Sequence, residues 1–381
     1  MREQDGKGLS PKERMICVLS HEEPDRVPCG EIASDYSITD RAINKQTLYR
    51  GKWRELNALW VGRRDDVARD YGEDVADLAL SFEWDYFGVQ LCPARKKQYP
   101  RPEFLGPYKW KDGLGRIWQF SPESEGHPLI TRYPPIEREA LLDVPLLDES
   151  QFESVERAVK RLGKSHFIVA RLPETTFPWE PTMGMEAYLM MMLDDPDYVH
   201  QLLDAYGRRA VDAIRKLGQI GVDAVSDGDD YCDNRGPITG HQLFSEFTLP
   251  ALRRIVDEAH KEKLYFVKHS DGNQWPILPD YVKIGVDAWQ GIQTLIGMDL
   301  KDLKERFGKE ITFFGGVNCE TLINGTPEDV EDEVAYAIRY AGAGGGLAIS
   351  CSNTLMVGLR YENVLAMYSA ARKHGQYPLS R

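Results

Sequence analysis

The chain has 381 residues, of which 42% are apolar and 28% are charged, and its formal net charge at pH 7 is −13. This composition is typical of a folded globular protein, because disordered chains are poor in hydrophobic residues. An acidic chain lacks the basic face that nucleic-acid phosphates require, and no apolar run approaches a membrane span, so we expect neither a nucleic-acid nor a membrane partner.

The cysteines indicate the compartment. Six of them are scattered along the chain without C-x-x-C spacing, at Cys17, Cys29, Cys92, Cys232, Cys319 and Cys351. This arrangement predicts neither a disulfide framework nor a zinc ribbon. The segment from Met1 to Leu9 is polar and lacks the apolar core of a signal peptide, so we expect a cytoplasmic protein.

Short apolar runs that end in polar residues alternate with helical patterns along most of the chain, which is typical of a parallel sheet covered by helices. The eight runs are Val27 to Ile32, Phe82 to Val89, Phe167 to Leu172, Asp223 to Ser226, Leu264 to Lys268, Ala288 to Ile292, Ile311 to Gly315 and Gly346 to Ser350. They predict an α/β fold, a (β/α)8 TIM-like barrel that occupies residues 1–381 as a single domain.

The stretch from about residue 92 to residue 145 interrupts this alternation. It is rich in proline, aromatic and charged residues, and the pattern around Gly113 to Trp118 predicts hairpins. Long irregular insertions in a compact domain are usually functional, so we interpret this one as a lid or a docking surface.

Two helices carry clear terminal signals. From Asp195 to Leu217 apolar residues recur at three-and-four spacing, and Pro196 occupies the first turn. A threonine cap, a proline in the first turn and nearby acids predict the second helix, from Thr326 to Tyr340. Each should bury one face against the barrel.

Polar side chains follow several of the predicted strands. In barrel enzymes the residues that perform the chemistry lie at these carboxyl ends. Here the ends supply Glu31, Asp35 and Tyr36 after the first strand, the run Asp227-Gly228-Asp229-Asp230 after the fourth, His269, Asp271 and Asn273 after the fifth, and Cys351 and Asn353 after the eighth. Each has a structural alternative: His269 as a core histidine, Asp271 in a turn before Gly272, and the cysteines as small apolar residues.

Several motifs resemble the uroporphyrinogen decarboxylase superfamily. They are Ser10-Pro11-Lys12-Glu13-Arg14, Glu23-Pro24-Asp25-Arg26-Val27-Pro28, Lys268-His269-Ser270-Asp271-Gly272-Asn273, Gly315-Gly316-Val317-Asn318-Cys319 and Tyr361-Glu362-Asn363-Val364. The resemblance implies a distorted (β/α)8 barrel and one of two chemistries. One branch decarboxylates porphyrinogen acetate groups without a cofactor, and the other transfers methyl groups to or from a corrinoid protein.

The segment after the first strand separates the two branches. True decarboxylases carry an arginine-rich sequence there, of the type R-Q-A-G-R-Y, and the arginine fork pairs well with substrate carboxylates. This chain reads Cys29 to Tyr36 at that place, without an arginine. The resemblance therefore favours the methyltransferase branch.

Within that branch, the enzymes that act on thiols hold zinc with His-x-Cys and a later cysteine. This chain has His269-x-Asp271, and its closing segment has Asn353 with Cys351 two residues earlier. The pattern does not match a thiol-activating site, although histidine and aspartate can bind zinc without thiolates. The chain instead resembles the components that demethylate a methyl donor.

These observations give the predicted site. We expect His269, Asp229 and Glu31 to be catalytic, and Asp35, Tyr36, Asp227, Asn273 and Asn353 to bind substrate, with His269, Asp271 and Cys351 as candidate zinc ligands.

The expected function is transfer of a methyl group from a small donor, such as a methoxylated aromatic compound, to the cobalamin of a corrinoid partner protein. A homodimer is compatible with this function. Two alternatives stay open: a decarboxylase of a small or tetrapyrrole acid, with Arg171 or Arg235 holding the carboxylate, and a non-catalytic module that binds a corrinoid or tetrapyrrole.

Overall fold

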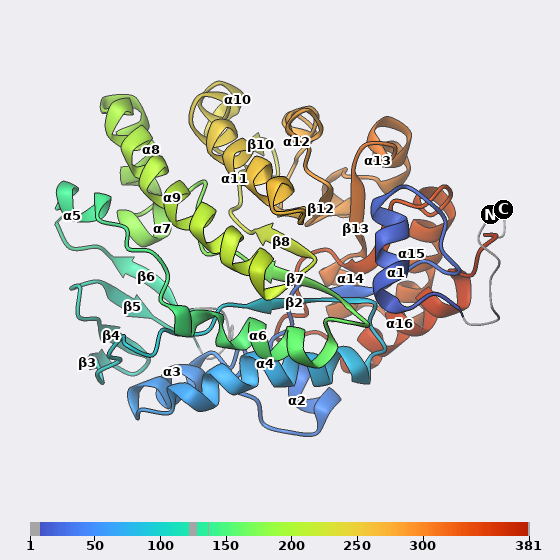
Figure 1. Cartoon of the computed structure of the whole chain (residues 1–381), viewed down its shortest axis with the longest axis horizontal. Coiled ribbons are helices and arrows are strands. Elements are labelled where there is room, and N and C mark those ends of the chain that lie inside the picture. The colour runs from blue at the N-terminus through green and yellow to red at the C-terminus, as the bar shows by residue number, and fades with distance from the viewer. Residues whose placement is uncertain (1–7, 122–127, 136, 380–381) are drawn as a thin grey trace.

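A barrel of eight parallel strands forms the centre of the computed structural model, which describes residues 8–121, 128–135 and 137–379 (Figure 1). The strands, in their order around the sheet, are β1 (Gly30–Glu31), β2 (Tyr86–Gln90), β7 (Phe167–Arg171), β8 (Ala224–Asp227), β11 (Tyr265–His269), β12 (Ala288–Gln290), β13 (Thr312–Val317) and β14 (Leu347–Cys351). All eight predicted strands are present, and the predicted (β/α)8 barrel is confirmed.

The barrel closes between its first and last strands. Cys29 forms a parallel bridge with Ile349, and the amide of Ile349 donates a 2.8 Å hydrogen bond to the carbonyl of Pro28. The ladder of β1 is only two residues long, shorter than the predicted run from Val27. Strand β2 also starts later than predicted, because Phe82 still belongs to the end of the preceding helix.

Side chains that alternate along the strands fill the barrel interior. They are Ile32, Tyr86, Phe167, Val169, Ala224, Val267, Ala288, Phe314 and Ala348, and they form one buried cluster with Met15, Val18 and Leu19 of α1 (Pro11–Leu19). Helix α1 therefore covers the amino-terminal end of the barrel. Because side chains alternate between the faces of a strand, Arg171, His269 and Gln290 continue these inward rows at the carboxyl ends.

Helices surround the sheet on its outer side (Figure 1). They are α2 (Tyr36–Ile43), α3 (Trp53–Trp60), α4 (Arg64–Ser81), α5 (Arg138–Leu142), α6 (Glu153–Leu162), α7 (Trp179–Thr182), α8 (Met185–Asp194), α9 (Pro196–Ile220), α10 (Gly240–Leu243), α11 (Leu249–Lys261), α12 (Leu278–Ile284), α13 (Leu300–Phe307), α14 (Cys319–Asn324), α15 (Pro327–Ala341) and α16 (Tyr361–His374). Both helices predicted from terminal signals are confirmed. Asp195 caps α9, and Thr326 and Asp329 form a reciprocal capping box at the start of α15.

The predicted insertion contains a sheet of its own. Its antiparallel strands are β3 (Glu103–Gly106), β4 (Lys109–Lys111), β5 (Ile117–Gln119) and β6 (Leu129–Arg132), and β4 and β5 form the hairpin predicted around Gly113 to Trp118. Figure 1 places this sheet at the opposite end of the molecule from α1. Trp53 and Trp60 of α3 pack against Phe104 and Trp110 of the sheet.

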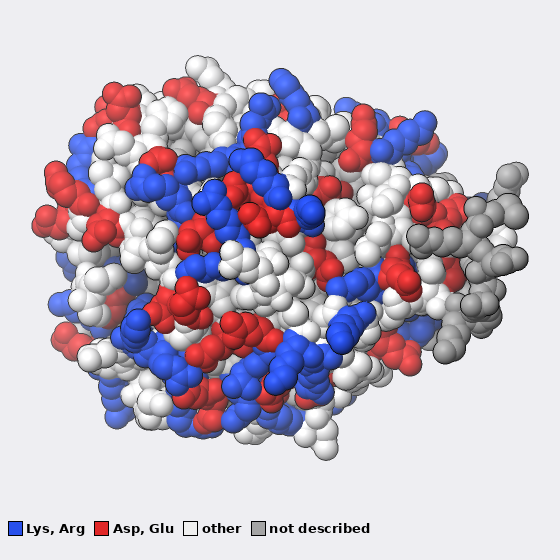
Figure 2. Space-filling model, in the orientation of Figure 1, with Lys and Arg blue, Asp and Glu red and all other residues white. Residues whose placement is uncertain are grey.

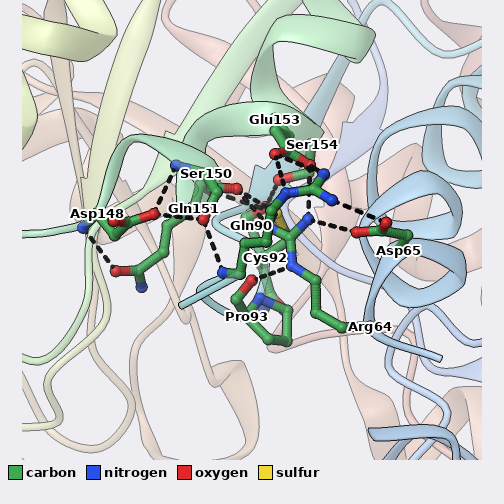
Figure 3. Close-up of polar contacts among 11 residues, drawn as sticks. Arg64, Asp65, Gln90, Cys92, Pro93, Asp148, Ser150, Gln151, Glu153 and Ser154 are labelled. Carbon is green, nitrogen blue, oxygen red and sulfur yellow. Dashed lines mark hydrogen bonds and ion pairs between the residues drawn. The ribbon is translucent and has the colours of Figure 1, made fainter. Parts of the chain in front are cut away.

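Arg64 joins the beginning of the insertion to the segment that follows it (Figure 3). Its guanidinium donates to the carbonyl of Pro93 at 2.6 Å and to that of Ser150 at 2.5 Å, and it forms an ion pair with Glu153 at 2.6 Å. Arg95 also bonds to Glu153, at 3.0 Å. Since an arginine fork holds several acceptors in a fixed geometry, this cluster anchors the insertion on α4.

The surface carries charges of both signs. On the face shown in Figure 2, lysine and arginine side chains are interspersed with aspartate and glutamate. In the described part of the chain, none of the helices combines the length and the apolar character needed to cross a membrane.

Candidate active site

Three polar side chains from two neighbouring strand ends meet at the barrel mouth. His269 ends β11, Asp271 lies two residues later, and Asp230 lies in the loop after β8, the strand that pairs with β11. The His269 Nε2 atom is 3.8 Å from an Asp230 carboxylate oxygen and 4.0 Å from one of Asp271. One donor atom from each residue lies within 4.8 Å of the other two, as ligands of a single cation would.

Gln290 of β12 orients the His269 ring. The amide nitrogen of Gln290 donates to the carbonyls of Cys351 and Asn353, which leaves its oxygen facing His269 Nδ1. Nδ1 must therefore carry the proton of the neutral ring, and Nε2 presents a lone pair to the two carboxylates. A lone pair facing two acids is favourable only with a proton or a cation between them.

Asp271 is held in place at one of its two oxygens. Its Oδ2 accepts a hydrogen bond from Asn353, and its backbone amide donates to Asp230 at 2.9 Å. Its Oδ1 is buried without a hydrogen-bond partner among the described residues. Burial raises the pKa of Asp271 to about 6, although the nearby His269 ring opposes the shift. The orphaned oxygen is the one nearest His269 Nε2.

A fully buried lysine ties together the two loops that carry this group. The Lys268 ammonium donates to the carboxylate of Asp227 at 2.7 Å and to the carbonyls of Asp229 and His269 at 2.7 and 2.6 Å. It also lies 4.0 Å from the centre of the Tyr231 ring. Burial raises the pKa of Asp227 to about 6, and Lys268 acts against that rise. Asp227, which the sequence predicts as a substrate ligand, thus belongs to a buried ion pair on the outer side of the sheet.

Asp229 supports the loop after β7. One of its oxygens accepts hydrogen bonds from the backbone amides of Thr175, Thr176 and Phe177, at 3.1, 2.7 and 2.8 Å. The sequence favours Asp229 as the catalytic member of the acidic run, but Asp230 is the member that reaches His269. No residue-type signal separates these two neighbours, since only their backbone positions decide which one faces the mouth.

Glu31 and Cys351 contact each other between the barrel and α16. One Glu31 oxygen accepts from the Cys351 amide at 2.9 Å and from the Tyr368 hydroxyl at 3.1 Å, and the other lies 3.3 Å from Cys351 Sγ. Both side chains are fully buried. Burial raises the pKa of the Glu31 carboxyl well above its usual range, although its hydrogen bonds with Cys351 and Tyr368 oppose the rise. The structure does not bring this pair into the group around His269.

We expect Glu31→Gln to fold with a loss of less than about 1 kcal/mol, because the amide is neutral and its nitrogen can donate to the sulfur. Glu31→Ala should lower the free energy of unfolding by about 2 to 4 kcal/mol, since it leaves a cavity and three donors without their acceptor. Urea unfolding of both variants, with exposed Glu310→Ala as a control, measures the difference. Unchanged stability in Glu31→Ala would contradict this structural role.

Asp35 lies at the mouth among cations. Its two oxygens form ion pairs with Arg50 at 2.8 Å and Lys52 at 2.7 Å, and these cations hold the pKa of Asp35 below its usual value although burial opposes them. Tyr36 begins α2, and the Arg54 guanidinium lies 4.1 Å from the centre of its ring.

The two predicted amide ligands differ in their positions. Asn353 bonds to Asp271 and belongs to the group around His269. Asn273 instead accepts from the amide of Trp275 at 3.2 Å, as a residue that stabilises a turn does. Asp230 and Gln290 were not selected by the sequence analysis, and the signal available for Gln290 was its position at the end of the sixth strand.

The residues at the mouth fit a divalent cation. Asp230, His269 and Asp271 supply two carboxylate oxygens and one imidazole nitrogen, which are ligands of zinc and of harder divalent metals. The Nδ1 hydrogen bond to Gln290 is the support that metal-binding histidines usually have. Cys351, the third predicted ligand, is bonded to Glu31 and is not in this group.

Comparisons with known proteins agree with this fold. The family model for uroporphyrinogen decarboxylase (URO-D) matches residues 179–374. The uroporphyrinogen decarboxylase of Neisseria meningitidis serogroup C is 28% identical over 167 residues, 41% of this chain and 43% of that protein, so the match spans less than half of the relative. The one from Pseudoalteromonas translucida is 21% identical over 71% of each chain. A solved methyltransferase from Methanosarcina mazei superposes with a TM-score of 0.67 and 19% identity, covering 96% of this chain and 99% of that chain, which is a likeness of fold.

Proposed function

Because the chain belongs to the uroporphyrinogen decarboxylase (URO-D) family, we propose that it is the methyltransferase type of that fold. It would transfer a methyl group from a small methylated donor, such as a methoxylated aromatic compound, to the cobalamin of a corrinoid partner protein. The observation that carries the proposal is the group of Asp230, His269 and Asp271 at the barrel mouth. The fold likeness to a methyltransferase supports it.

The chemistry of ether demethylation fits this group. The methyl carbon passes to the reduced corrinoid of the partner, the carbon–oxygen bond breaks, and its electron pair stays on the oxygen. The oxygen becomes a phenolate that must be neutralised, and a proton donor or a cation close to it lowers the barrier. Asp271 is suited to deliver a proton there, because burial raises its pKa to about 6.

Asp230, His269 and Asp271 would hold the metal if one is used, and zinc is the candidate that the family resemblance suggests. A bound divalent ion would act as a Lewis acid toward the leaving oxygen. The role of the protein is then to fix the three ligands. Gln290 fixes the His269 ring, Asn353 fixes the Asp271 carboxylate, and Lys268 fixes the two loops.

Gln290→Leu should weaken the affinity for cobalt(II), used as a spectroscopic substitute for zinc, by about 10- to 100-fold, because the His269 ring loses the acceptor that orients it. Titration of the apoprotein by visible absorbance measures the affinity. Gln201→Leu, at an exposed position of α9, is the control. An unchanged cobalt affinity in Gln290→Leu would contradict the assigned ligand set.

The activity is tested by incubating the protein with free cob(I)alamin and a panel of methoxylated aromatic compounds and methylamines. Methyl transfer is expected with at least one donor and appears as the change from the cob(I)alamin to the methylcobalamin spectrum. Absence of transfer from every donor, with added zinc and a corrinoid protein, would contradict the proposal.

A decarboxylase of a carboxylic acid is the second candidate, and the names of the curated relatives favour it. The segment from Cys29 to Tyr36 still lacks an arginine, although Arg50 and Lys52 fold back to Asp35 in the same region. Release of carbon dioxide from an acid substrate without methyl transfer would favour this candidate. A non-catalytic corrinoid-binding module predicts neither reaction.

A further inference from the structure

Arg171 is a partly buried cation that has no ionic partner among the residues that the structure describes. It ends β7, and the inward positions Phe167 and Val169 on the same strand place its side chain in the row that leads to the barrel mouth. Its backbone is paired in the sheet, but its guanidinium forms no hydrogen bond and no ion pair with any residue in the described ranges. None of its nitrogens is among the buried unpartnered atoms of the described residues, so the guanidinium remains accessible at the mouth and can form charge-assisted hydrogen bonds with an anionic ligand.

The loop after β8 leaves space for this guanidinium. A Cβ atom built on Gly228 would lie 2.7 Å from Arg171 Nη2 and 3.0 Å from its Cζ, closer than side-chain contacts allow. Gly228 immediately precedes Asp229 and Asp230, whose loop is fixed by Lys268. A side chain at position 228 would therefore push the guanidinium out of its place.

The neighbourhood of Arg171 is rich in cations. Tyr49 is fully buried, and both Arg50 and Arg171 are near enough to oppose the rise in its pKa that burial causes. Arg50 and Lys52 both form ion pairs with Asp35. Glu55 is an acid close to Arg50 and Lys52, and burial raises its pKa to about 7, so it offsets their charge only in part at neutral pH.

We propose that Arg171 binds the carboxylate of the methyl donor, so that the substrate is a methoxylated acid rather than a neutral ether. The identification of the bound acid as a methyl donor rests on the proposed function. The assignment of Arg171 as an anion-binding residue does not depend on it. Strands β7 and β11 are separated by β8 alone, which puts their axes about 10 Å apart. A single benzene ring with its carboxylate on Arg171 and its methoxy group toward His269 is of a size that fits this spacing.

Calorimetric titration of the wild-type protein with 4-methoxybenzoate, benzoate and methoxyacetate, each compared with its uncharged amide, tests the site. We expect at least one acid to bind more tightly than its amide. Arg171→Gln should weaken that acid about 10- to 100-fold and leave the amide unchanged, because charge-assisted hydrogen bonds to a guanidinium are lost. Arg171→Lys should lose less affinity for the acid, since it keeps the charge. Gly228→Ala should also lower the affinity for the acid, because its Cβ displaces the guanidinium.

Arg208→Gln is the matched control, because Arg208 has an exposed side chain on α9 paired with Asp204 and loses the same charge. The proposal is overturned if no acid binds better than its amide, or if Arg171→Gln and Arg208→Gln bind the acid equally well. Acid binding that depends on Arg171 without any methyl transfer would support the anion site and reject the methyltransferase function. Methyl transfer from neutral ethers at a rate that is unchanged in Arg171→Gln would support the methyltransferase function and reject the anion site.

Discussion

Replacement of His269 by alanine is expected to lower the rate of methyl transfer by about 10²- to 10⁴-fold, the range that a positioned acid–base group contributes. Without the ring, Asp230 and Asp271 lose the nitrogen that lies 3.8 and 4.0 Å from their oxygens. The two acids alone form a weaker cation site, and no imidazole remains to share a proton with them. The initial rate of methylcobalamin formation at saturating donor measures the effect.

The matched control for this variant is His241→Ala. His241 is exposed, pairs with Asp280 at 2.9 Å and is not a member of the group of Asp230, His269 and Asp271. It should retain the wild-type rate. Circular dichroism and urea unfolding of both variants separate a loss of activity from a loss of fold, and a His269→Ala protein that is folded and fully active would remove this residue from the chemistry.

Replacement of Lys268 by methionine should destabilise the protein by about 3 to 5 kcal/mol, because it leaves Asp227 buried without its counter-ion. Both side chains are completely buried, and their atoms are 2.7 Å apart. Methionine has nearly the same length, so the change mainly removes the charge and its three hydrogen bonds. The midpoint and slope of urea unfolding at pH 8 give the free energy of unfolding.

The loss of stability in Lys268→Met should depend on pH. The folded-state pKa of Asp227 is already raised to about 6, above its unfolded value of 3.8, and removing Lys268 raises it further. The folded variant then binds a proton that the unfolded chain does not, so its deficit relative to wild type grows as pH rises above about 6 and shrinks toward pH 5. Adding Asp227→Asn should recover part of the loss at pH 8.

Lys373→Met is the control for this experiment. Lys373 is paired with Glu331 on the surface, with 63% of its side chain exposed, and such a pair contributes at most about 1 kcal/mol. Equal losses in Lys268→Met and Lys373→Met would contradict the role assigned to the buried ion pair.

The periodicity of the sequence was sufficient to predict most of the fold. The eight strands and the helices that start at Pro196 and Pro327 are local features, set by alternating apolar residues and by caps. The error at Phe82 is local as well. Helix α4 ends at Ser81 with Phe82 as its C-cap residue, and Glu83 then adopts a positive φ before β2 begins.

The site was less predictable because it depends on which face of each strand a residue occupies. His269 and Asp271 were identified by their motif, but Glu31, Asp227 and Cys351 lie near the same strand ends and point away from the barrel mouth. A shift of one residue in the assumed alignment of a strand moves each side chain to the opposite face of the sheet. Because a barrel strand is apolar on both faces, its sequence does not show which residues point inward. The pairing of Asp35 with Arg50 and Lys52 depends on a chain reversal that no motif encodes.

The most direct test of the proposed reaction traces an isotope label in the methoxy group and in the carboxylate of the same donor. A 4-methoxybenzoate with ¹³C in its methoxy group, and a second sample with ¹³C in its carboxylate, are each incubated with the protein, cob(I)alamin and a corrinoid protein. A methyltransferase moves the methoxy label into methylcobalamin and leaves the carboxylate label in 4-hydroxybenzoate. Release of the carboxylate label as carbon dioxide, with the methoxy group retained, would contradict methyl transfer and identify a decarboxylase.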